Sequence, residues 1–344
     1  MSVAHSDLLH ACRRESVQHT PVWFMRQAGR SLPEYRAVRA KHSFMEVCRQ
    51  PELCAEITLQ PVRRLGVDAA ILFADIMTPL IAIGVDLELK ENVGPVIAHP
   101  IATERDLEQL RPLDASDIPF VTDAIKLVKQ ELGDATPLIG FAGAPFTLAS
   151  YLIEGRGSRN FTKTKALMYG APTLWHALMV KLSDMTIAYL TAKVHAGVDV
   201  VQIFDSWVGC LSPMDYATYV QPYSRQIIQA VRETGVPVIH FGTNTATLLP
   251  LMATDGASVV GADWRIPLDD AWTAIGHDTA IQGNIDPALL LAPWPVVEAG
   301  ARDVLRRASG RAGHIFNLGH GIYPETPLDT IIQLVAFVQN YRES

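Results

Sequence analysis

Eight short apolar runs, rich in β-branched residues, recur along the 344-residue chain, and a longer stretch with helical periodicity follows each of them. Gly, Asp, Asn or His closes each run. Strands that are apolar throughout are typical of a parallel sheet with helices on its faces. Eight strand–helix units are the number that closes into a barrel of about 250 residues. The runs are residues 21–25, 67–75, 137–143, 198–206, 236–243, 257–263, 279–285 and 314–321.

This pattern predicts an α/β protein with a single (β/α)8 TIM barrel. We assign the excess length to insertions and to an N-terminal helical leader over residues 1–20. No low-complexity tract, short repeat or Pro/Ser-rich linker marks a boundary, so we expect one domain over residues 1–344. An open, doubly wound sheet is the alternative, but no GxGxxG motif follows any run and no P-loop is present.

The charge balance limits the partners of the chain. Its 29 Lys and Arg residues against 36 Asp and Glu residues give a net charge of −7. This disfavours nucleic acid or an anionic membrane surface as the main partner. The longest weakly polar run, residues 76–85, is far shorter than the roughly 20 residues that cross a bilayer, and the N-terminus has no signal pattern. The four cysteines have no CxxC spacing, which fits a reduced, cytoplasmic protein without a disulfide framework.

Polar residues stand where the apolar runs end. In a barrel the carboxyl ends of the strands meet at one mouth, where the chemistry of this fold takes place. We therefore expect one convergent polar set. It consists of Arg26, Arg30, Asp75, Tyr151, Asp205, Ser206, His240, Asp263, Arg265, Asn284, Asp286 and His320.

The first run leads directly into an arginine-rich stretch, "PVWFMRQAGRSLPEYR", residues 21–36. A guanidinium group is a rigid fork that matches a carboxylate or a phosphate. Arg26 and Arg30 are four residues apart, so a helical turn would place them on one side, and Gly29 would let the backbone approach a bound group. The spacing alone fits equally well a solvated surface with a Glu34–Arg30 pair.

The convergent set contains Arg, Asp, Tyr, Ser and His but no evident metal-ligand pattern. It indicates a polyanionic substrate and catalysis by fixed charge and proton transfer. His240 is followed by Phe and Gly, and no cysteine closes a run, so a thiolate zinc site is not predicted. No lysine stands at a strand end, where a Schiff-base aldolase would need one. We expect neither a metal nor an organic cofactor.

Five segments resemble the signatures of the uroporphyrinogen decarboxylase family and occur in the family's order almost from end to end. They are residues 21–36, "GFAGAPFTLASYLIEG" at 140–155, "FDSWVG" at 204–209, "QGNIDP" at 282–287 and "NLGHGIYPETP" at 317–327. The resemblance implies a cofactor-free (β/α)8 enzyme of haem biosynthesis, usually a homodimer. Its substrate would be uroporphyrinogen III, which loses the carboxyl groups of its four acetate side chains to give coproporphyrinogen III.

The resemblance also implies roles for single residues. The segment Arg26, Gln27, Ala28, Gly29 and Arg30 would hold substrate carboxylates, with Arg39 as a helper. Asp75 would accept hydrogen bonds from the pyrrole N–H groups at the centre of the tetrapyrrole. Tyr151, Ser206 and His320 would line the pocket and bind the remaining polar substituents. An eight-carboxylate substrate thus explains a cluster of arginines in an acidic protein.

Decarboxylation leaves an electron pair that needs a sink, which pyridoxal phosphate, thiamine or a metal usually supplies. An electron-rich pyrrole can be its own sink once a ring carbon is protonated. A carboxylate beside the ring nitrogens would stabilise the resulting cation in a dry site, and Asp75 is our candidate for this role. Arg26 or Arg30 is our candidate for the group near the leaving carboxylate.

Structural roles remain as alternatives at these positions. Asp75 could cap a helix, His320 could satisfy loop backbone groups, and Tyr151 and Ser206 could be a half-buried ring and a cap. The roles of Asp205, His240 and Asp263 stay open between the site and the rim of the barrel. Two other functions also remain: a zinc-dependent corrinoid methyltransferase of the same superfamily, and a non-catalytic tetrapyrrole-binding protein.

Overall fold

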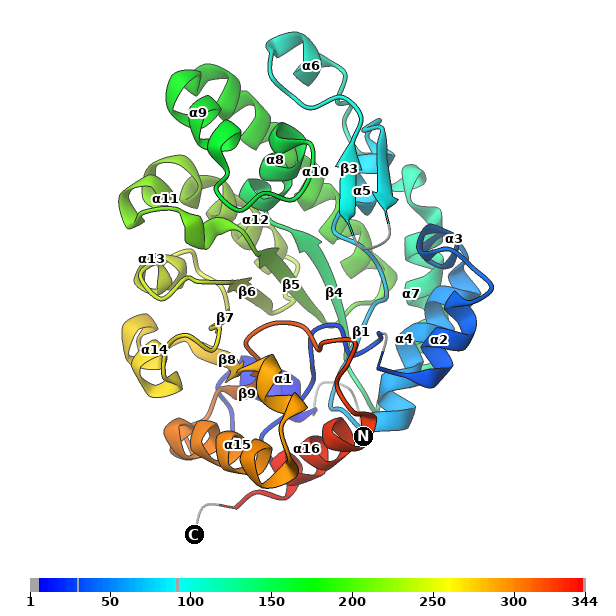
Figure 1. Ribbon diagram of the computed structural model, residues 1–344, viewed down its shortest axis with the longest axis vertical. Helices are drawn as coiled ribbons and strands as arrows, with labels where there is room; N and C mark the ends of the chain where they lie inside the picture. Colours follow the sequence, from blue (N-terminus) through cyan, green and yellow to red (C-terminus); the bar gives the residue numbers. More distant parts are fainter. Residues whose placement is uncertain (1–5, 30, 91–92, 343–344) are drawn as a thin grey trace.

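Seven parallel strands form one curled sheet at the centre of the molecule (Figure 1). The structure is a computed structural model and describes residues 6–29, 31–90 and 93–342. Within these residues the strand order is β1-β4-β5-β6-β7-β8-β9, and every neighbouring pair is parallel. The strands are β1 (Ala70–Ile71), β4 (Leu138–Gly143), β5 (Val200–Asp205), β6 (Val238–Gly242), β7 (Val259–Gly261), β8 (Ala280–Ile285) and β9 (His314–Leu318).

The strands follow seven of the eight predicted runs, which are rich in apolar residues and are buried on both faces. Every residue of β4, β6, β7, β8 and β9 is buried. Side chains on one face of the sheet meet in the interior and those on the other face meet the helices, as a parallel sheet requires. The prediction of an α/β fold with a parallel sheet is confirmed.

The first predicted run, residues 21–25, is not a regular strand, and a closed eight-stranded sheet is therefore confirmed only in part. This segment forms a single parallel bridge, between Val22 and Phe316 of β9. On its other side the Asp68 N–H donates to the Val22 carbonyl at 2.8 Å. The Val22 N–H donates to a carboxylate oxygen of Asp68 instead of a backbone carbonyl, at 2.8 Å, which ends the ladder on that side.

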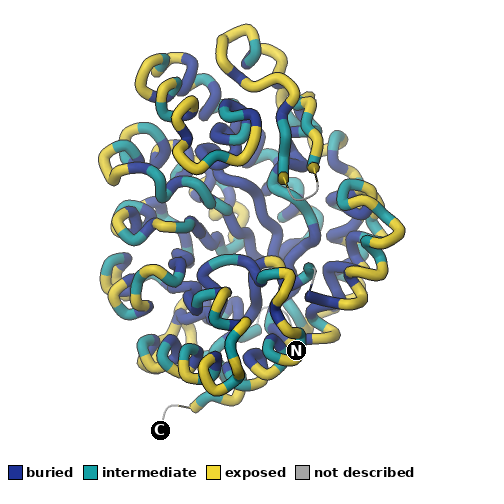
Figure 2. Tube along the Cα trace, in the orientation of Figure 1, coloured by how far each residue is buried: buried dark blue, intermediate teal, exposed yellow. Residues whose placement is uncertain are grey.

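Helices surround the sheet, with exposed outer faces and buried inner faces (Figure 2). They are α1 (Asp7–Cys12), α2 (Pro33–Arg39), α3 (Phe44–Arg49), α4 (Pro51–Leu65), α5 (Thr78–Ala82), α6 (Glu104–Glu108), α7 (Pro119–Leu132), α8 (Pro145–Glu154), α9 (Thr162–Gly170), α10 (Pro172–Ala196), α11 (Pro213–Tyr219), α12 (Gln221–Arg232), α13 (Leu249–Ala253), α14 (Leu268–Ile275), α15 (Trp294–Ala308) and α16 (Leu328–Asn340). The predicted leader thus contains a short helix, α1.

Two long helical stretches of the sequence behave differently. α10 runs unbroken for 25 residues and ends at Gly197, whose φ of 119° is one that glycine adopts without strain. Residues 212–235, which follow the fourth run and have helical periodicity, are instead divided into α11 and α12 at Val220. Pro222 explains the division, because proline lacks an N–H and is tolerated only in the first turn of a helix.

An antiparallel hairpin, which the sequence analysis did not predict, lies between α5 and α6 at the top of Figure 1. It consists of β2 (Leu87–Lys90) and β3 (Gly94–Ile97). The Ile97 N–H donates to the Gly155 carbonyl at 2.8 Å, and the Ile101 N–H donates to the Leu152 carbonyl at 2.9 Å. These bonds fix the hairpin segment to the C-terminal end of α8.

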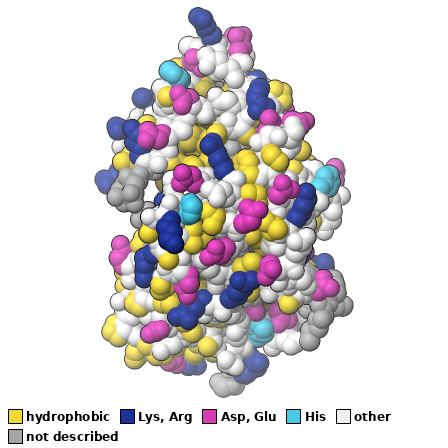
Figure 3. Space-filling view, turned by 90° about the vertical axis from the view of Figure 1, so that its right-hand side faces the viewer, with side chains coloured by type: hydrophobic (Ala, Val, Ile, Leu, Met, Phe, Trp, Pro, Cys, Tyr) yellow, Lys and Arg dark blue, Asp and Glu magenta, His cyan; other side chains and the backbone are white. Residues whose placement is uncertain are grey.

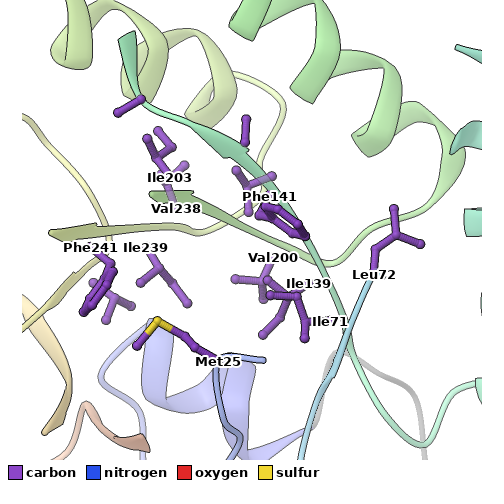
Figure 4. Close-up of a cluster of buried hydrophobic side chains, with 14 of the residues drawn as sticks. Met25, Ile71, Leu72, Ile139, Phe141, Val200, Ile203, Val238, Ile239 and Phe241 are labelled. Carbon is purple, nitrogen blue, oxygen red and sulfur yellow. The ribbon is translucent and has the colours of Figure 1, made fainter. Parts of the chain in front are cut away.

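The interior of the sheet is filled with apolar side chains (Figure 4). Met25 lies there beside Ile71, Ile139, Val200 and Ile239, which come from β1, β4, β5 and β6. Burial of one such side chain contributes about 1.5–3 kcal/mol to folding. The strands also carry buried polar side chains away from their ends: Gln282 of β8 donates to Gln202 of β5 at 3.1 Å.

The outer surface carries charges of both signs. On the face shown in Figure 3, acidic and basic side chains are interspersed with apolar ones. Among the described helices, none combines the length and the apolar character needed to cross a bilayer.

Candidate active site

The loop that carries Arg26 follows the segment bridged to β9 and is held in an uncommon conformation. Arg26 has a φ of 60°, in the left-handed region that non-glycine residues seldom occupy. Gln27 stabilises this turn: its side-chain oxygen accepts the Phe24 N–H at 3.0 Å, and its amide donates to the Ala69 carbonyl at 2.9 Å. Gln27 is fully buried, so its side chain holds the loop and is not exposed at the mouth.

The rest of the arginine stretch folds back on itself. A Cβ atom on Gly29 would lie 2.7 Å from the Arg26 carbonyl oxygen, so the turn requires glycine at this position. Ala28 and Gly29 are half-buried. Arg30 lies outside the described residues. Glu34, the other member of the alternative surface pair, lies 3.6 Å from Arg64.

The loop after β9 lies directly against Arg26. The Ile322 N–H donates to the Met25 carbonyl at 3.0 Å, which joins the two loops. A Cβ atom on Gly321 would lie 2.5 Å from Cδ and 2.7 Å from Cγ of Arg26. The arginine side chain therefore runs across the backbone of Gly321, in a position that glycine alone leaves free. His320 precedes this glycine, so the structure brings Arg26 and His320 together.

His320 is an uncharged imidazole, and one of its two ring nitrogens accepts a hydrogen bond from the backbone. Burial, and after it the positive charge of Arg26, lower the pKa of His320 to about 4. Its Nδ1 accepts the Gly321 N–H at 2.7 Å. In a neutral ring the proton then resides on Nε2. This Nε2–H has no partner within the described part of the chain and is available to a ligand.

Asp75 ends the chain segment that follows β1. Its Oδ1 accepts the Met77 N–H at 2.8 Å and so holds the turn before α5, but Met77 is the N-cap of that helix and no side chain caps it, so Asp75 is not the capping residue. Burial raises the pKa of this carboxyl, while the Met77 N–H and the charge of Arg26 act in the opposite direction. The carboxylate thus combines a structural bond with a position near Arg26.

Tyr151 comes to the same place from α8. Burial raises its pKa, and the negative charge of Asp75 adds to this effect while Arg26 opposes it. Tyr151, Asp75 and Arg26 therefore lie within electrostatic range of one another. The Tyr151 ring packs edge-on against Trp207 with the ring centroids 5.8 Å apart.

Ser206 precedes that tryptophan, at the end of β5. Its side chain is half-buried, and its carbonyl accepts the Thr243 hydroxyl at 2.5 Å. Phe161 packs on the other side of Trp207 at 5.6 Å. The structure thus places Ser206 beside the aromatic wall formed by Tyr151, Trp207 and Phe161.

Asp205 and His240, which the sequence left open, are fully buried behind this wall. Asp205 accepts the Thr147 hydroxyl at 3.0 Å, and Thr147 in turn accepts the Trp207 N–H at 3.3 Å. The His240 nitrogens lie 3.8 Å from Asp205 on one side and 3.8 Å from Asp255 on the other. Asp205 and Thr147 therefore support the wall from inside.

Lys193 of α10 is a buried group to which the sequence assigned no role beyond its absence from the strand ends. It is fully buried, and its Nζ donates to the Phe141 carbonyl at 2.7 Å and lies 4.1 Å from the centre of the Tyr189 ring. Burial lowers the pKa of this amine to about 7. A single lysine in an amphipathic pattern gives no signal that it points inward.

Arg39, the predicted helper, is half-buried near the end of α2. Its Nη1 donates to the His42 carbonyl at 2.5 Å, and its guanidinium lies 5.9 Å from the centre of the Phe44 ring. Among the described residues, no group of three or more His, Cys, Asp or Glu side chains is placed to hold a metal ion.

Arg26, Asp75, Tyr151 and His320 lie within electrostatic range of one another at the strand ends of a curled parallel sheet, where α/β enzymes of this kind carry their active sites. The sequence model described as "Uroporphyrinogen decarboxylase (URO-D)" matches residues 4–341. The chain belongs to the uroporphyrinogen decarboxylase family.

Curated relatives agree with this assignment. The chain is 57% identical over 335 residues to the uroporphyrinogen decarboxylase of Salinispora tropica, an alignment that covers 97% of this chain and 90% of the relative. It is 58% identical to that of Streptomyces griseus, with coverage of 97% and 91%. It is 51% identical to that of Carboxydothermus hydrogenoformans, with coverage of 96% and 95%.

Solved structures share the fold at much lower identity. A methyltransferase from Methanosarcina mazei superposes with a TM-score of 0.79 at 24% identity, over 98% of each chain. A B12-independent methionine synthase from Shewanella superposes with a TM-score of 0.58 at 10% identity, over 86% of this chain and 89% of that one. These likenesses show the fold alone.

Proposed function

We propose that this protein removes the four acetate carboxyl groups of uroporphyrinogen III, to give coproporphyrinogen III, at the mouth formed by Arg26, Asp75, Tyr151 and His320. The observation that carries the proposal is that these four residues, predicted from separate segments of the sequence, meet in one place. Membership of a family of decarboxylases supplies the reaction class. The alternative methyltransferase is not favoured, because the likeness to a methyltransferase lies at 24% identity.

The substrate is held by charge and by hydrogen bonds. We assign Arg26 and Arg30 to side-chain carboxylates, and Ala28 and Gly29, which stand between them in the sequence, are half-buried. Gln27 acts by fixing the loop, since both of its side-chain polar atoms are bonded inside the protein. Arg39 is a helper for a more distant carboxylate.

Three further side chains complete the binding site. His320 offers its Nε2–H to an oxygen of the substrate. Tyr151 and Ser206 bind polar substituents, and the ring of Tyr151 is held in place by Trp207 at 5.8 Å. Together they offer the tetrapyrrole hydrogen-bond donors and one aromatic wall.

Asp75 is the group that acts at the centre of the ring. Its carboxylate accepts hydrogen bonds from pyrrole N–H groups, and the charge of Arg26 acts against the rise in the pKa of Asp75 that burial causes. Protonation of a pyrrole ring carbon creates a cation, which the negative charge of Asp75 stabilises in a site shielded from water.

The bonds then change in a fixed order. The carbon–carbon bond to the carboxylate breaks, CO2 leaves, and the electron pair neutralises the ring. The exocyclic methylene carbon takes up a proton and the ring carbon returns one, so each CO2 released consumes one proton. Arg26 or Arg30 lies near the leaving carboxylate in this scheme.

The proposal extends to the whole molecule. The Val22–Phe316 bridge and the Asp68 hydrogen bond to Val22 support closure of the sheet as a (β/α)8 barrel. We propose a single domain over residues 1–344 with a leader over residues 1–20, and a cytoplasmic homodimer that binds neither nucleic acid nor a membrane.

Anaerobic incubation of the purified protein with reduced uroporphyrinogen III tests the function. We expect a four-carboxylate product, at a rate that dialysis against a chelator leaves unchanged. Binding of the tetrapyrrole without release of CO2 would instead establish a carrier. Activity lost on dialysis and restored by zinc would overturn the cofactor-free scheme.

A further inference from the structure

We propose that Arg265 is a further substrate-binding residue, which holds a peripheral carboxylate of the substrate on the side of the mouth next to His320. This inference rests on the proposed function, because it requires a substrate with carboxylates on several sides. None of the roles implied by the family resemblance falls on this residue. Four observations carry it.

The first observation is that a buried carboxylate fixes Arg265. Asp263, which follows β7, is 1% exposed, whereas the Arg265 side chain is 45% exposed. Asp263 accepts the backbone N–H of Arg265 at 3.0 Å and its Nη1 at 2.5 Å, and it also accepts the Asn244 N–H. A carboxylate with three donors does not rotate freely, so the arginine next to it is held in one orientation.

The second observation is an aromatic support beneath the guanidinium. The guanidinium carbon of Arg265 lies 4.0 Å from the centre of the Trp264 ring. A planar guanidinium stacked on an aromatic ring loses little conformational entropy when it binds a ligand. The Arg265 side chain is therefore preorganised for ligand binding.

The third observation places this pair beside His320. Residues 263–265 pass over the end of β8, where Asn284 donates to the carbonyls of Asp263 and Ile266 at 2.9 and 2.7 Å. A Cβ atom on Gly319 would lie 2.4 Å from the Trp264 nitrogen. The tryptophan backbone thus touches the residue that precedes His320.

The fourth observation is electrostatic. The charges that act on His320, apart from its burial, come from Arg26, Asp263 and Arg265 in decreasing order. The positive charge of Arg265 is therefore felt at a ring that we place in the binding site. His320 is thus within electrostatic range of two arginines that belong to different loops.

The donor inventory of Arg265 fits a carboxylate. Nη1 is bonded to Asp263, while Nε and Nη2 have no partner among the residues that the structure describes. Two donors on one guanidinium can bind one carboxylate with both of its oxygens. An exposed ion pair with no ligand would contribute little to stability, so the elaborate support of this arginine points to binding.

Steady-state kinetics with reduced uroporphyrinogen III test the inference, using Arg265→Ala, Arg265→Lys and a matched control. Arg302→Ala is the control, because Arg302 of α15 pairs with Glu298 at 2.7 Å, stacks over Phe337 at 5.1 Å and is 54% exposed. It has the same kinds of contact as Arg265 but lies outside the mouth. Thermal unfolding of each variant reports whether the fold is retained.

We expect Arg265→Ala to raise KM about tenfold with kcat changed less than threefold, Arg265→Lys to recover part of the loss, and Arg302→Ala to leave both constants unchanged. KM values for Arg265→Ala and Arg302→Ala that both lie within twofold of the wild-type value would overturn the inference. Should Arg265→Ala unfold, Arg265→Gln, which keeps the stem over Trp264, decides by the same criterion.

The assignment of Arg265 and the proposed function fail in different ways. A wild-type protein that releases no CO2 refutes the function. Anaerobic titration with coproporphyrinogen III then still measures whether binding depends on Arg265, with an unchanged dissociation constant in Arg265→Ala counting against its role.

Discussion

Gly321→Ala is the substitution that most directly perturbs the geometry of the arginine clamp without removing any functional group. The backbone of Gly321 has no positive φ, so alanine fits its conformation. The obstacle is the side chain of Arg26. The new methyl carbon would lie 2.5 Å from Cδ, 2.7 Å from Cγ and 3.1 Å from Cβ of that arginine.

The size of the effect follows from these distances. Carbon atoms in contact lie about 3.5–4.0 Å apart, so Cδ must move by about 1 Å (3.5 minus 2.5) or the loop must shift with it. Misplacement of a substrate-positioning group by about 1 Å can cost about 10²-fold in rate. We expect kcat/KM to fall between about 10-fold and 100-fold, which corresponds to about 1.4–2.7 kcal/mol.

A double-mutant cycle tests whether Gly321→Ala lowers kcat/KM by displacing Arg26. If Gly321→Ala acts by displacing Arg26, the double variant with Arg26→Ala should be no worse than Arg26→Ala alone, since the displaced group is already absent. Gly170→Ala is the control, because Gly170 is an exposed residue of α9 whose Cβ would meet no atom within 4 Å. The assay is the initial rate of CO2 release from reduced uroporphyrinogen III.

Two results would refute this reasoning. A Gly321→Ala variant with the kcat/KM of the wild type would show that Arg26 can leave its position without loss. Fully additive losses in the double variant would show that the methyl group acts on some other element, such as His320.

Three further predictions concern single side chains. Arg26→Ala should cost about 2–5 kcal/mol of transition-state binding if the substrate buries the guanidinium, and Arg26→Lys should restore little of it. A normal kcat/KM in both variants would mean that Arg26 is a solvated surface residue. The pKa of Lys193 is lowered to about 7 in the folded protein. Between pH 7 and the ordinary lysine pKa near 10.5 the unfolded chain therefore binds more protons than the folded protein. The free energy of unfolding should rise with pH across this window, by up to about 1.4 kcal/mol per pH unit. Chemical unfolding of Lys193→Met should lack this slope, and an identical slope in both proteins would contradict its assignment. The pKa of His320 is lowered to about 4, so the pH profile of kcat/KM between pH 5 and 8 should contain no His320 titration; a transition near pH 6.5 that vanishes in His320→Asn would disprove this.

The sequence predicted the sheet because its strands are buried on both faces. The run 137–143 has no polar side chain that could face water, and it forms β4, whereas the run 314–321 forms β9 with its polar residues His314 and Asn317 buried. The segment 21–25 is equally apolar, but its Val22 N–H donates to the side chain of Asp68 and not to a backbone carbonyl of a neighbouring strand. The pattern of apolar residues does not reveal that a side chain takes the place of the strand here.

The polar set was predictable from its place at the ends of strands. The closeness of Arg26, Asp75, Tyr151 and His320 follows from the topology once the strands are parallel. Gly321 was indicated too, since glycines flank His320 in the sequence, but the reason for glycine is visible only in the path of the Arg26 side chain. The same holds for Gln27, which occurs in the arginine motif but serves the loop from inside.

Other features depend on contacts between distant segments, which a single sequence does not encode locally. The support of Trp207 by Thr147 and Asp205 joins α8 to the end of β5. The inward position of Lys193 depends on the Phe141 carbonyl of a neighbouring strand. The hairpin of β2 and β3 has short, half-exposed strands, whose pattern is too weak to predict.

Single-turnover decarboxylation by Asp75→Asn and Asp75→Glu, at saturating uroporphyrinogen III, tests the central claim most directly. Saturation separates the chemical step from binding. Asn keeps the size of the side chain but removes the charge, while Glu keeps the charge and displaces it by one methylene group. Because fixed charge in a dry site is worth a few kcal/mol, we predict a loss of about 10²-fold or more for Asp75→Asn and a smaller loss for Asp75→Glu. An Asp75→Asn variant as fast as the wild type, or faster than Asp75→Glu, would mean that Asp75 only holds the turn before α5 and that the cation is stabilised elsewhere.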